Sequence, residues 1–313
     1  MILTDDAEVS EHDLDEIRRV AQNALISADA VGVFPTPVDQ ILEAAKIEVV
    51  PITLDENYLS RLRASAGRAL LSAITKVWGV LDHKSRIAFI DPNTPREKLP
   101  FLKLHEGGHA LLKWQEIYGY FEDCRLTLNP DTKMLFERQA NVFASEVLFQ
   151  LNSYSAVASD FTFGIEVPLK LAKQYGASVY SSIRRYVSQN ERESVLLVLN
   201  PAEVTDAGSF YSLRRVVTSR SYREKFKGVC WPELITNSHP LYKLIPRRRM
   251  TYPREIALSD DNGCIQTWMG EAFKTTHHVF LLLYASHRGI QLRRSSRTLI
   301  IPEASNWHRS SDT

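Results

Sequence analysis

The stretch Leu104–Leu112, LHEGGHALL, decides how this sequence is interpreted. It has the apolar spacing of a buried helix, yet it contains two histidines four residues apart, one glutamate and two adjacent glycines. Each glycine destabilises a helix interior by about 0.8–1 kcal/mol relative to alanine. Polar side chains in an apolar helix also need partners. A metal ion would satisfy the polar groups, and the glycines would let a neighbouring element pack closely.

Residues four apart lie on one face of a helix, so His105 and His109 can direct their imidazoles at a single point. Tetrahedral Zn²⁺ binds imidazole nitrogens in this way, at about 2.0–2.1 Å. Glu106 lies one residue further round the helix, and the spacing predicts that it is the general base for a zinc-activated water. The alternative is a pair of buried histidines without a metal, because the H-E-x-x-H pattern also occurs by chance.

A third protein ligand is expected from the helix predicted at residues 133–148. Glu137 shares one face of that helix with Ala140 and Asn141, and the small residue would allow a close approach to the histidine helix. Glu137 is therefore the favoured ligand, while Glu146, which lies off this face, is the competitor. The resulting His₂Glu set leaves a fourth position open, and it could also hold Mn²⁺ or Fe²⁺.

Other elements follow from apolar spacing and from turn residues. Helices are expected at 13–30, 38–45 and 101–114, with a helix pair at 168–187 hinged at 176–178, and strands at 47–52, 77–82, 85–91, 194–199, 277–285 and 298–302. Pro100 lacks an N–H group, so the histidine helix either kinks there or begins near that residue.

The composition is that of a globular protein, with 44% apolar residues, 24% charged residues and a net charge of +1. No apolar run approaches the length of a membrane span, and the acidic start does not resemble a secretion signal, so a cytoplasmic location is expected. Cys124, Cys230 and Cys264 form no C-x-x-C pair and are expected to be reduced thiols. Residues 191–313 contain 18 Lys and Arg against 12 Asp and Glu, whereas residues 1–190 contain 20 against 25.

Three regions together resemble the ImmA/IrrE family of metallopeptidases. They are PVDQILEAAKIEVV at 37–50, GVLDHKSRIAFID followed by REKLPFLKLHEGGHALL at 79–112, and ERQANVFASEVLF at 137–149. Matching these motifs residue by residue implies that His105, His109 and Glu137 bind the metal and that Glu106 is the catalytic base. Gly107 stands where an aliphatic residue is common in the family, which affects the packing and no ligand.

The resemblance implies an α+β protein in three parts. Residues 1–155 would be a helix-rich, zincin-like peptidase domain with a small sheet, whose edge strand, for which residues 85–91 are the candidate, pairs with an extended substrate. Residues 156–190 would be a helix-turn-helix-like segment, and residues 191–313 a C-terminal α/β domain similar to a GAF-like sensor. The implied activity is regulatory zinc endopeptidase cleavage of a partner protein, such as a repressor of the helix-turn-helix class.

Two other functions stay open at this point. The chain could be a transcription regulator or sensor with a non-catalytic zinc site, or a component of toxin–antitoxin type for which partner binding matters more than turnover. The helix pair at 168–187 would either bind DNA or serve as packing, and the basic segments 214–227 and 247–254 could contact nucleic-acid phosphates or be solvated faces. Tyr118 and Tyr120 are candidates for stabilising a developing oxyanion.

Overall fold

The computed structural model describes residues 9–51, 79–83, 85–115, 130–205, 208–226, 231–259 and 265–285. The described helices are α1 (Glu11–Ser27), α2 (Val38–Ala44), α5 (Leu99–Leu111), α7 (Pro130–Leu148), α8 (Ser153–Ser159), α9 (Glu166–Tyr175), α10 (Val179–Ser188), α11 (Arg220–Lys225) and the 3₁₀ helix η1 (Pro240–Leu244). The described strands are β1 (Glu48–Pro51), β2 (Gly79–Asp82), β3 (Ile87–Ile90), β4 (Ser194–Leu199), β5 (Glu203–Thr205), β6 (Gly208–Thr218), β7 (Leu234–Thr236), β8 (Arg254–Ser259), β9 (Ile265–Lys274) and β10 (Val279–Ala285).

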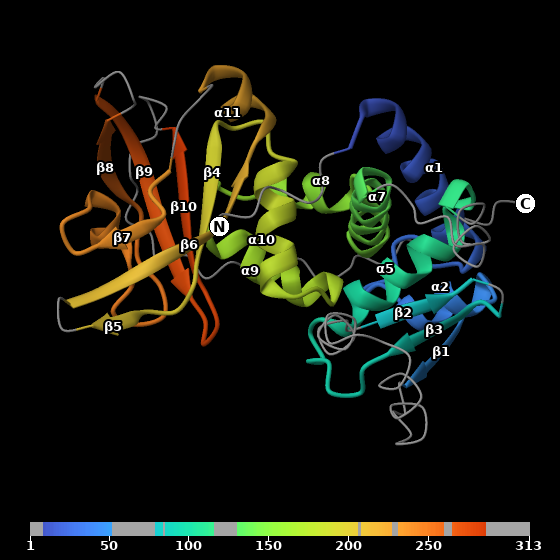
Figure 1. Ribbon diagram of the computed structural model, residues 1–313. Coiled ribbons are helices and arrows are strands. Elements are labelled where there is room, and N and C mark those ends of the chain that lie inside the picture. The colour runs from blue at the N-terminus through green and yellow to red at the C-terminus, as the bar shows by residue number, and fades with distance from the viewer. Residues whose placement is uncertain are drawn as a thin grey trace, which may run out of the picture.

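Helices and strands occupy separate regions of the molecule (Figure 1). A small sheet of β1, β2 and β3 lies beside α1, α2, α5 and α7, the strands from β4 to β10 form a larger sheet, and α8, α9 and α10 lie between the two regions. This segregation confirms the α+β class. None of the described helices is both long and apolar enough to cross a membrane. The expected domain boundary at 155 falls inside α8 and the one at 190 falls before β4, and the three-part division stays a prediction.

Local sequence signals account for the helix ends. α5 begins at Leu99 with Pro100 in its first turn, which confirms that the histidine helix begins near the proline and does not kink there. α9 ends at Gly176, whose φ of 68° is left-handed, and the Ser178 hydroxyl then accepts the Ser181 backbone N–H at the start of α10. The expected hinge between these two helices is therefore confirmed.

The small sheet has the order β1-β3-β2, with β3 parallel to β1 and antiparallel to β2. The expectation that residues 85–91 form the edge strand is wrong, because β3 has a hydrogen-bonded neighbour on each side. Its register places Ile87 opposite Glu48 on one side and Ile90 opposite Gly79 on the other. The outer strands are β1 and β2, and β2 packs beside α5.

The larger sheet has the order β5-β6-β4-β10-β9-β8, and β7 pairs with β6. β4 is buried along its whole length, with Leu196 and Val198 in the core next to the helices and Val195, Leu197 and Leu199 in a second core on the opposite face. This two-sided burial explains the uninterrupted apolar run of the strand. Every described pairing in this sheet is antiparallel. The α/β class expected for the C-terminal part implies parallel strands that alternate with helices, and the described strands do not follow that pattern. The strand expected at 298–302 lies outside the described residues, as do the three cysteines.

The helix pair packs against the larger sheet. α10 contacts β4 and β6, and each of its ten residues is buried or partly buried. A recognition helix that enters a DNA groove needs an exposed face. The observed burial therefore favours the packing interpretation of the helix pair.

A buried ion cluster joins three helices. Glu146 of α7 accepts hydrogen bonds from Arg185 of α10 at 2.6 and 3.2 Å and from Arg18 of α1 at 3.2 Å. Burial by itself would raise the pKa of Glu146, but the two guanidinium groups outweigh it and hold this pKa below its usual range. Glu146 therefore connects α7 to the helix pair and lies outside the group that Glu137 forms with His105 and His109.

We expect Glu146→Gln to lower the free energy of unfolding by about 3–5 kcal/mol at neutral pH, because the change leaves Arg185 buried without its counter-charge. The folded pKa of Glu146 lies below the unfolded value, so its contribution is present above the unfolded pKa and disappears as pH falls through the folded pKa. The difference between the two proteins should shrink in acid. Urea unfolding at pH 7 and pH 4 measures it, with Glu16→Gln at a surface pair as the control, and equal stabilities at pH 7 would contradict the assignment.

Candidate metal centre

The two glycines of the motif face two different neighbours. A methyl group at Gly108 would lie 3.0 Å from Phe143 Cδ1 and 3.3 Å from the Cα atom of Ala140, both on α7. A methyl group at Gly107 would lie 2.6 Å from Leu42 Cδ2 on α2. The glycines therefore let α7 and α2 approach α5 more closely than any other residue would allow, as the sequence predicted.

This close approach brings the three predicted ligands together. His105 Nε2 lies 3.3 Å from His109 Nε2 and 3.3 Å from Glu137 Oε2, and His109 Nε2 lies 3.7 Å from Glu137 Oε1. One ligand atom from each residue falls within 4.8 Å of the other two, and no further His, Cys, Asp or Glu of the described chain joins the group. The histidine side chains are mostly buried, whereas that of Glu137 is 51% exposed, so one side of the triad is open to solvent.

Two distances within the triad suit a tetrahedral cation. Ligands bound at about 2.0–2.1 Å in a tetrahedron lie about 3.3–3.4 Å from one another. The two imidazole Nε2 atoms, and His105 Nε2 with Glu137 Oε2, have this separation. The 3.7 Å separation of His109 Nε2 is to the other carboxylate oxygen, Oε1, and one ligand atom from each residue lies within 4.8 Å of the other two. The residues present therefore fit a divalent metal, with Zn²⁺ as the expected ion.

The outer nitrogens of both histidines face amide oxygens. His105 Nδ1 lies 3.1 Å from Asn141 Oδ1, and His109 Nδ1 lies 2.8 Å from Gln115 Oε1. An amide oxygen can only accept, so each Nδ1 carries a hydrogen. The Nε2 of neutral His109 presents a lone pair to the centre of the triad, whereas His105 Nε2 donates to Glu137 when it is protonated and would present a lone pair once a metal replaced that proton. This is how metal-binding histidines are usually oriented by their neighbours.

Gln115 is itself held in place by a hydrogen-bonded network. Its Nε2 donates to Gln139 Oε1 at 3.0 Å and to the Phe136 carbonyl at 3.3 Å, and Trp114 Nε1 donates to the same Gln139 oxygen at 2.9 Å. The orientation of His109 is thus anchored on α7. Sequence reasoning did not identify Gln115, because it follows the end of α5 and has no periodic relation to the ligands.

The pKa values of the three triad side chains are shifted in different directions. Burial lowers the pKa of His105, but its hydrogen bond to Glu137 and the nearby carboxylates outweigh this effect and raise it above the usual value. Burial and the neighbouring His105 lower the pKa of His109 to about 4, so His109 is neutral and free to bind a metal. The hydrogen bond from His105 holds the pKa of Glu137 below its usual range, which keeps it a carboxylate.

Glu106 lies apart from the triad, as predicted for a residue that is not a ligand. It is buried, and this burial raises its pKa to about 7 despite the opposing effect of His105. No hydrogen bond ties its carboxylate to the described part of the chain. A carboxylate that changes charge near neutral pH can accept and release a proton under physiological conditions. Tyr118 and Tyr120 lie outside the described residues.

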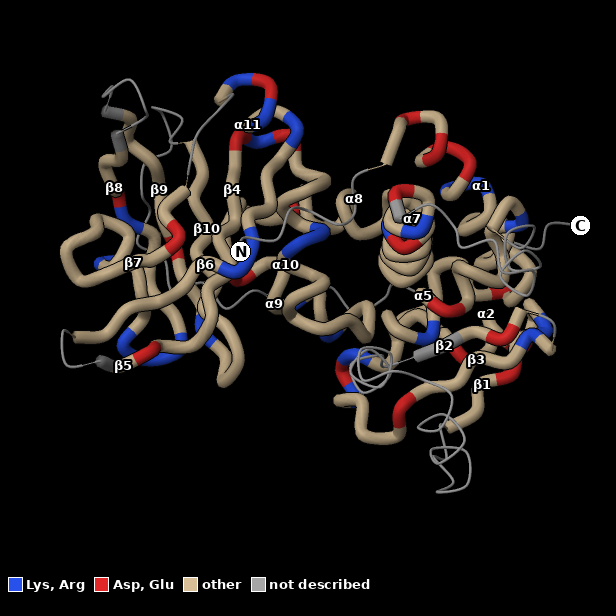
Figure 2. Tube along the Cα trace, viewed as in Figure 1, with Lys and Arg blue, Asp and Glu red and all other residues tan. Residues whose placement is uncertain are grey.

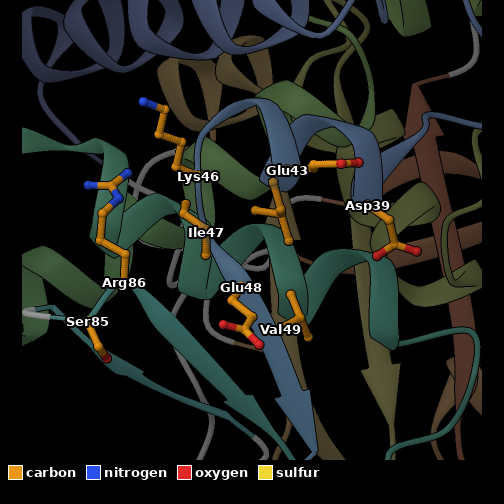
Figure 3. Close-up of a pocket in the computed structure, with 9 residues that line it drawn as sticks. Asp39, Glu43, Lys46, Ile47, Glu48, Val49, Ser85 and Arg86 are labelled. Atoms are coloured by element: carbon orange, nitrogen blue, oxygen red, sulfur yellow. The ribbon is translucent and has the colours of Figure 1, made fainter.

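A separate pocket of about 460 Å³ lies at the corner of α2 and β1, next to Arg86 (Figure 3). Its lining contains acidic and basic side chains and no member of the triad. The Arg86 guanidinium donates to the carbonyl of Ala45 at 3.0 Å and to that of Ala110 at 3.5 Å. Arg86 therefore joins the ends of α2 and α5, and the pocket is no part of the metal centre.

No protein-family model matches this chain, and no curated protein matches it in sequence. Eleven chains of solved structures match it. One of them is a Mycobacterium tuberculosis transcriptional regulator, which aligns with 86% of this chain and 87% of its own length at 10% identity and a TM-score of 0.47. The chemistry of the site is therefore inferred from its own geometry.

We expect Gln115→Leu to weaken zinc binding about 10- to 100-fold, because the change removes the acceptor that orients His109. Gln115→Glu should restore only part of the affinity, since a carboxylate can accept the same hydrogen but cannot donate to Gln139 and to the Phe136 carbonyl. Competition with a chromogenic chelator measures zinc affinity. Gln40→Leu at an exposed position of α2 is the control, and an unchanged affinity in Gln115→Leu would contradict the role of this network.

We expect Gly108→Ala to weaken zinc binding more than Gly107→Ala does. The first methyl group meets the backbone of α7 and would displace the helix that carries Glu137, whereas the second meets the end of the flexible Leu42 side chain. Overpacking costs about 1–3 kcal/mol and alanine returns about 0.8–1 kcal/mol of helix propensity, so the loss of stability at Gly108 should be about 0–2 kcal/mol. Chelator competition and thermal unfolding compare the variants, and a larger zinc deficit in Gly107→Ala would be evidence against this packing argument.

Proposed function

We propose that this chain is a zinc-dependent endopeptidase of regulatory type, related to the ImmA/IrrE metallopeptidases. The observation that carries the proposal is the meeting of His105, His109 and Glu137, each with one ligand atom within 4.8 Å of the other two, with one side open. Both outer nitrogens face amide oxygens and both inner nitrogens face the same carboxylate, which is the arrangement that metal-binding histidines usually have.

The chemistry divides between the metal and the chain. When bound, Zn²⁺ would act as a Lewis acid that activates water and polarises a peptide carbonyl. Glu106 accepts the proton of the attacking water and returns it to the leaving amine. Its pKa of about 7 suits both steps, and a nearby cation would lower that pKa and keep more of the carboxylate ready to accept a proton at neutral pH.

The substrate in this proposal is an extended segment of a partner protein. β2 is an outer strand of the small sheet in the described part of the chain and packs beside α5, so we propose that its outer edge pairs with a peptide that passes the triad. This assignment replaces the strand at 85–91, which is central. The resemblance of the motifs suggests a repressor of the helix-turn-helix class as the partner.

The Glu106→Gln variant tests the proposal. Glutamine keeps the shape of the side chain but cannot accept the proton, so we expect zinc binding to persist while cleavage falls at least about 100-fold. Zinc content and the appearance of new N-termini in a mixed-sequence peptide library, read by mass spectrometry, measure the two properties.

His105→Ala is the companion variant, and it should lose both zinc and cleavage. Equal cleavage by the wild type and Glu106→Gln would contradict the proposed mechanism. A protein that binds zinc but generates no new N-termini in the library or in co-expressed proteins would favour a regulator, or a partner-binding component with a non-catalytic metal.

A further inference from the structure

The segment Lys243–Arg254, KLIPRRRMTYPR, is a basic stretch far from the triad in the sequence. It contains five cationic side chains and no acidic residue, and all five are exposed. We refer to Lys243–Arg254 as the basic edge segment. Figure 2 shows Lys and Arg beside β8 and at the end of the larger sheet near β5.

The backbone of the basic edge segment is held against β9. The Thr251 N–H donates to the Ala272 carbonyl at 2.9 Å, the Lys274 N–H donates to the Arg249 carbonyl at 2.8 Å, and Met250 forms an antiparallel bridge with Phe273. The segment thereby continues the line of β8, an outer strand of the sheet. Its side chains are presented by an ordered backbone and not by a free loop.

The charges of the basic edge segment are not neutralised by any acidic side chain in the described part of the chain. In the described part of the structure, its arginines form no ion pair: Arg254 donates to the Lys243 carbonyl, and the Arg249 guanidinium lies 5.3 Å from the centre of the Phe273 ring. Lys274 of β9 adds a further cation beside Arg249. Like charges that lie close together repel one another, and a polyanion would relieve this repulsion.

The α11 helix provides a contrast within the same region. Arg220 pairs with Glu224 and Glu11, and Lys225 pairs with Glu193. Figure 2 shows acidic and basic positions mixed there, at the other end of the sheet. The basic sequence of α11 is thus a balanced surface, whereas the basic edge segment is not.

An aromatic side chain lies among the unpaired arginines. Tyr252 is 85% exposed, and the neighbouring Met250 is 36% exposed. Charged residues and prolines on an outer strand often have a single role, which is to prevent edge-to-edge aggregation. That role does not call for an exposed aromatic ring, whereas a positive groove with aromatic platforms is the usual construction of sites for single-stranded nucleic acid. We propose that the basic edge segment binds single-stranded nucleic acid through phosphate contacts by its arginines and base stacking on Tyr252.

The test is the binding of a fluorescein-labelled oligothymidine to the full chain, followed by anisotropy as a function of salt. The triple variant Arg247→Ala, Arg248→Ala, Arg249→Ala should weaken binding and reduce the slope of log affinity against log salt by about 2, because each single-strand phosphate contact contributes about 0.7. Tyr252→Ala should weaken binding about tenfold with an unchanged slope, because stacking is not ionic.

The matched control is Arg220→Ala, Arg223→Ala, Lys225→Ala, which removes the same charge from α11 and should leave binding nearly unchanged. Thermal unfolding confirms that each variant is folded. The proposal is overturned if the wild type does not bind at low salt, or if the control loses as much affinity as the edge variant. It is also overturned if Tyr252→Ala binds normally, since the surface would then recognise a polyanion without reading bases. Oligouridine in place of oligothymidine distinguishes RNA from DNA as the source.

Discussion

The structure depends on the close contact between α5 and α7. Gly108 and Ala140 remove the side chains that would separate the two helices, and the contact brings two imidazoles and a carboxylate within reach of one ion. Any bulkier pair would move Glu137 away from the histidines, because a tightly packed interior transmits a change of one methyl group. The helix propensity lost at Gly108 is therefore offset by the close packing that positions Glu137 beside the two histidines.

The sequence predicted those features that short patterns control. The spacing of His105 and His109, the hinge at Gly176, and the strand at Ser194–Leu199 all depend on neighbours along the chain, and each is found as expected. The central position of β3 was not predictable, because the pairing of a four-residue strand is decided by strands distant in sequence. Gln115 was missed for a similar reason, since the groups that hold its amide in place, Gln139 and the Phe136 carbonyl, lie across a packing interface on α7.

Glu146 illustrates why composition alone cannot assign a buried acid. In the sequence it is one of two glutamates on a helix next to a metal motif. The structure shows that it is paired with Arg18 and Arg185, which are 128 and 39 residues away. Glu137 and Glu146 have the same chemistry, and only their surroundings differ: one lies beside two imidazoles and the other between two guanidinium groups.

Glu137 and Glu146 also belong to the same helix, α7. α7 has 19 residues and thus a length of about 28 Å. It presents Glu137 to the imidazoles near its start and Glu146 to the guanidinium groups near its end. When one end of α7 is held in place, the helix has less orientational freedom left to lose when its other end is held. Cation binding at the triad and ion pairing at Glu146 are therefore thermodynamically linked. A cation held at the open triad would consequently tighten the junction between the helices and the larger sheet, and a loosened junction would make the same cation easier to release.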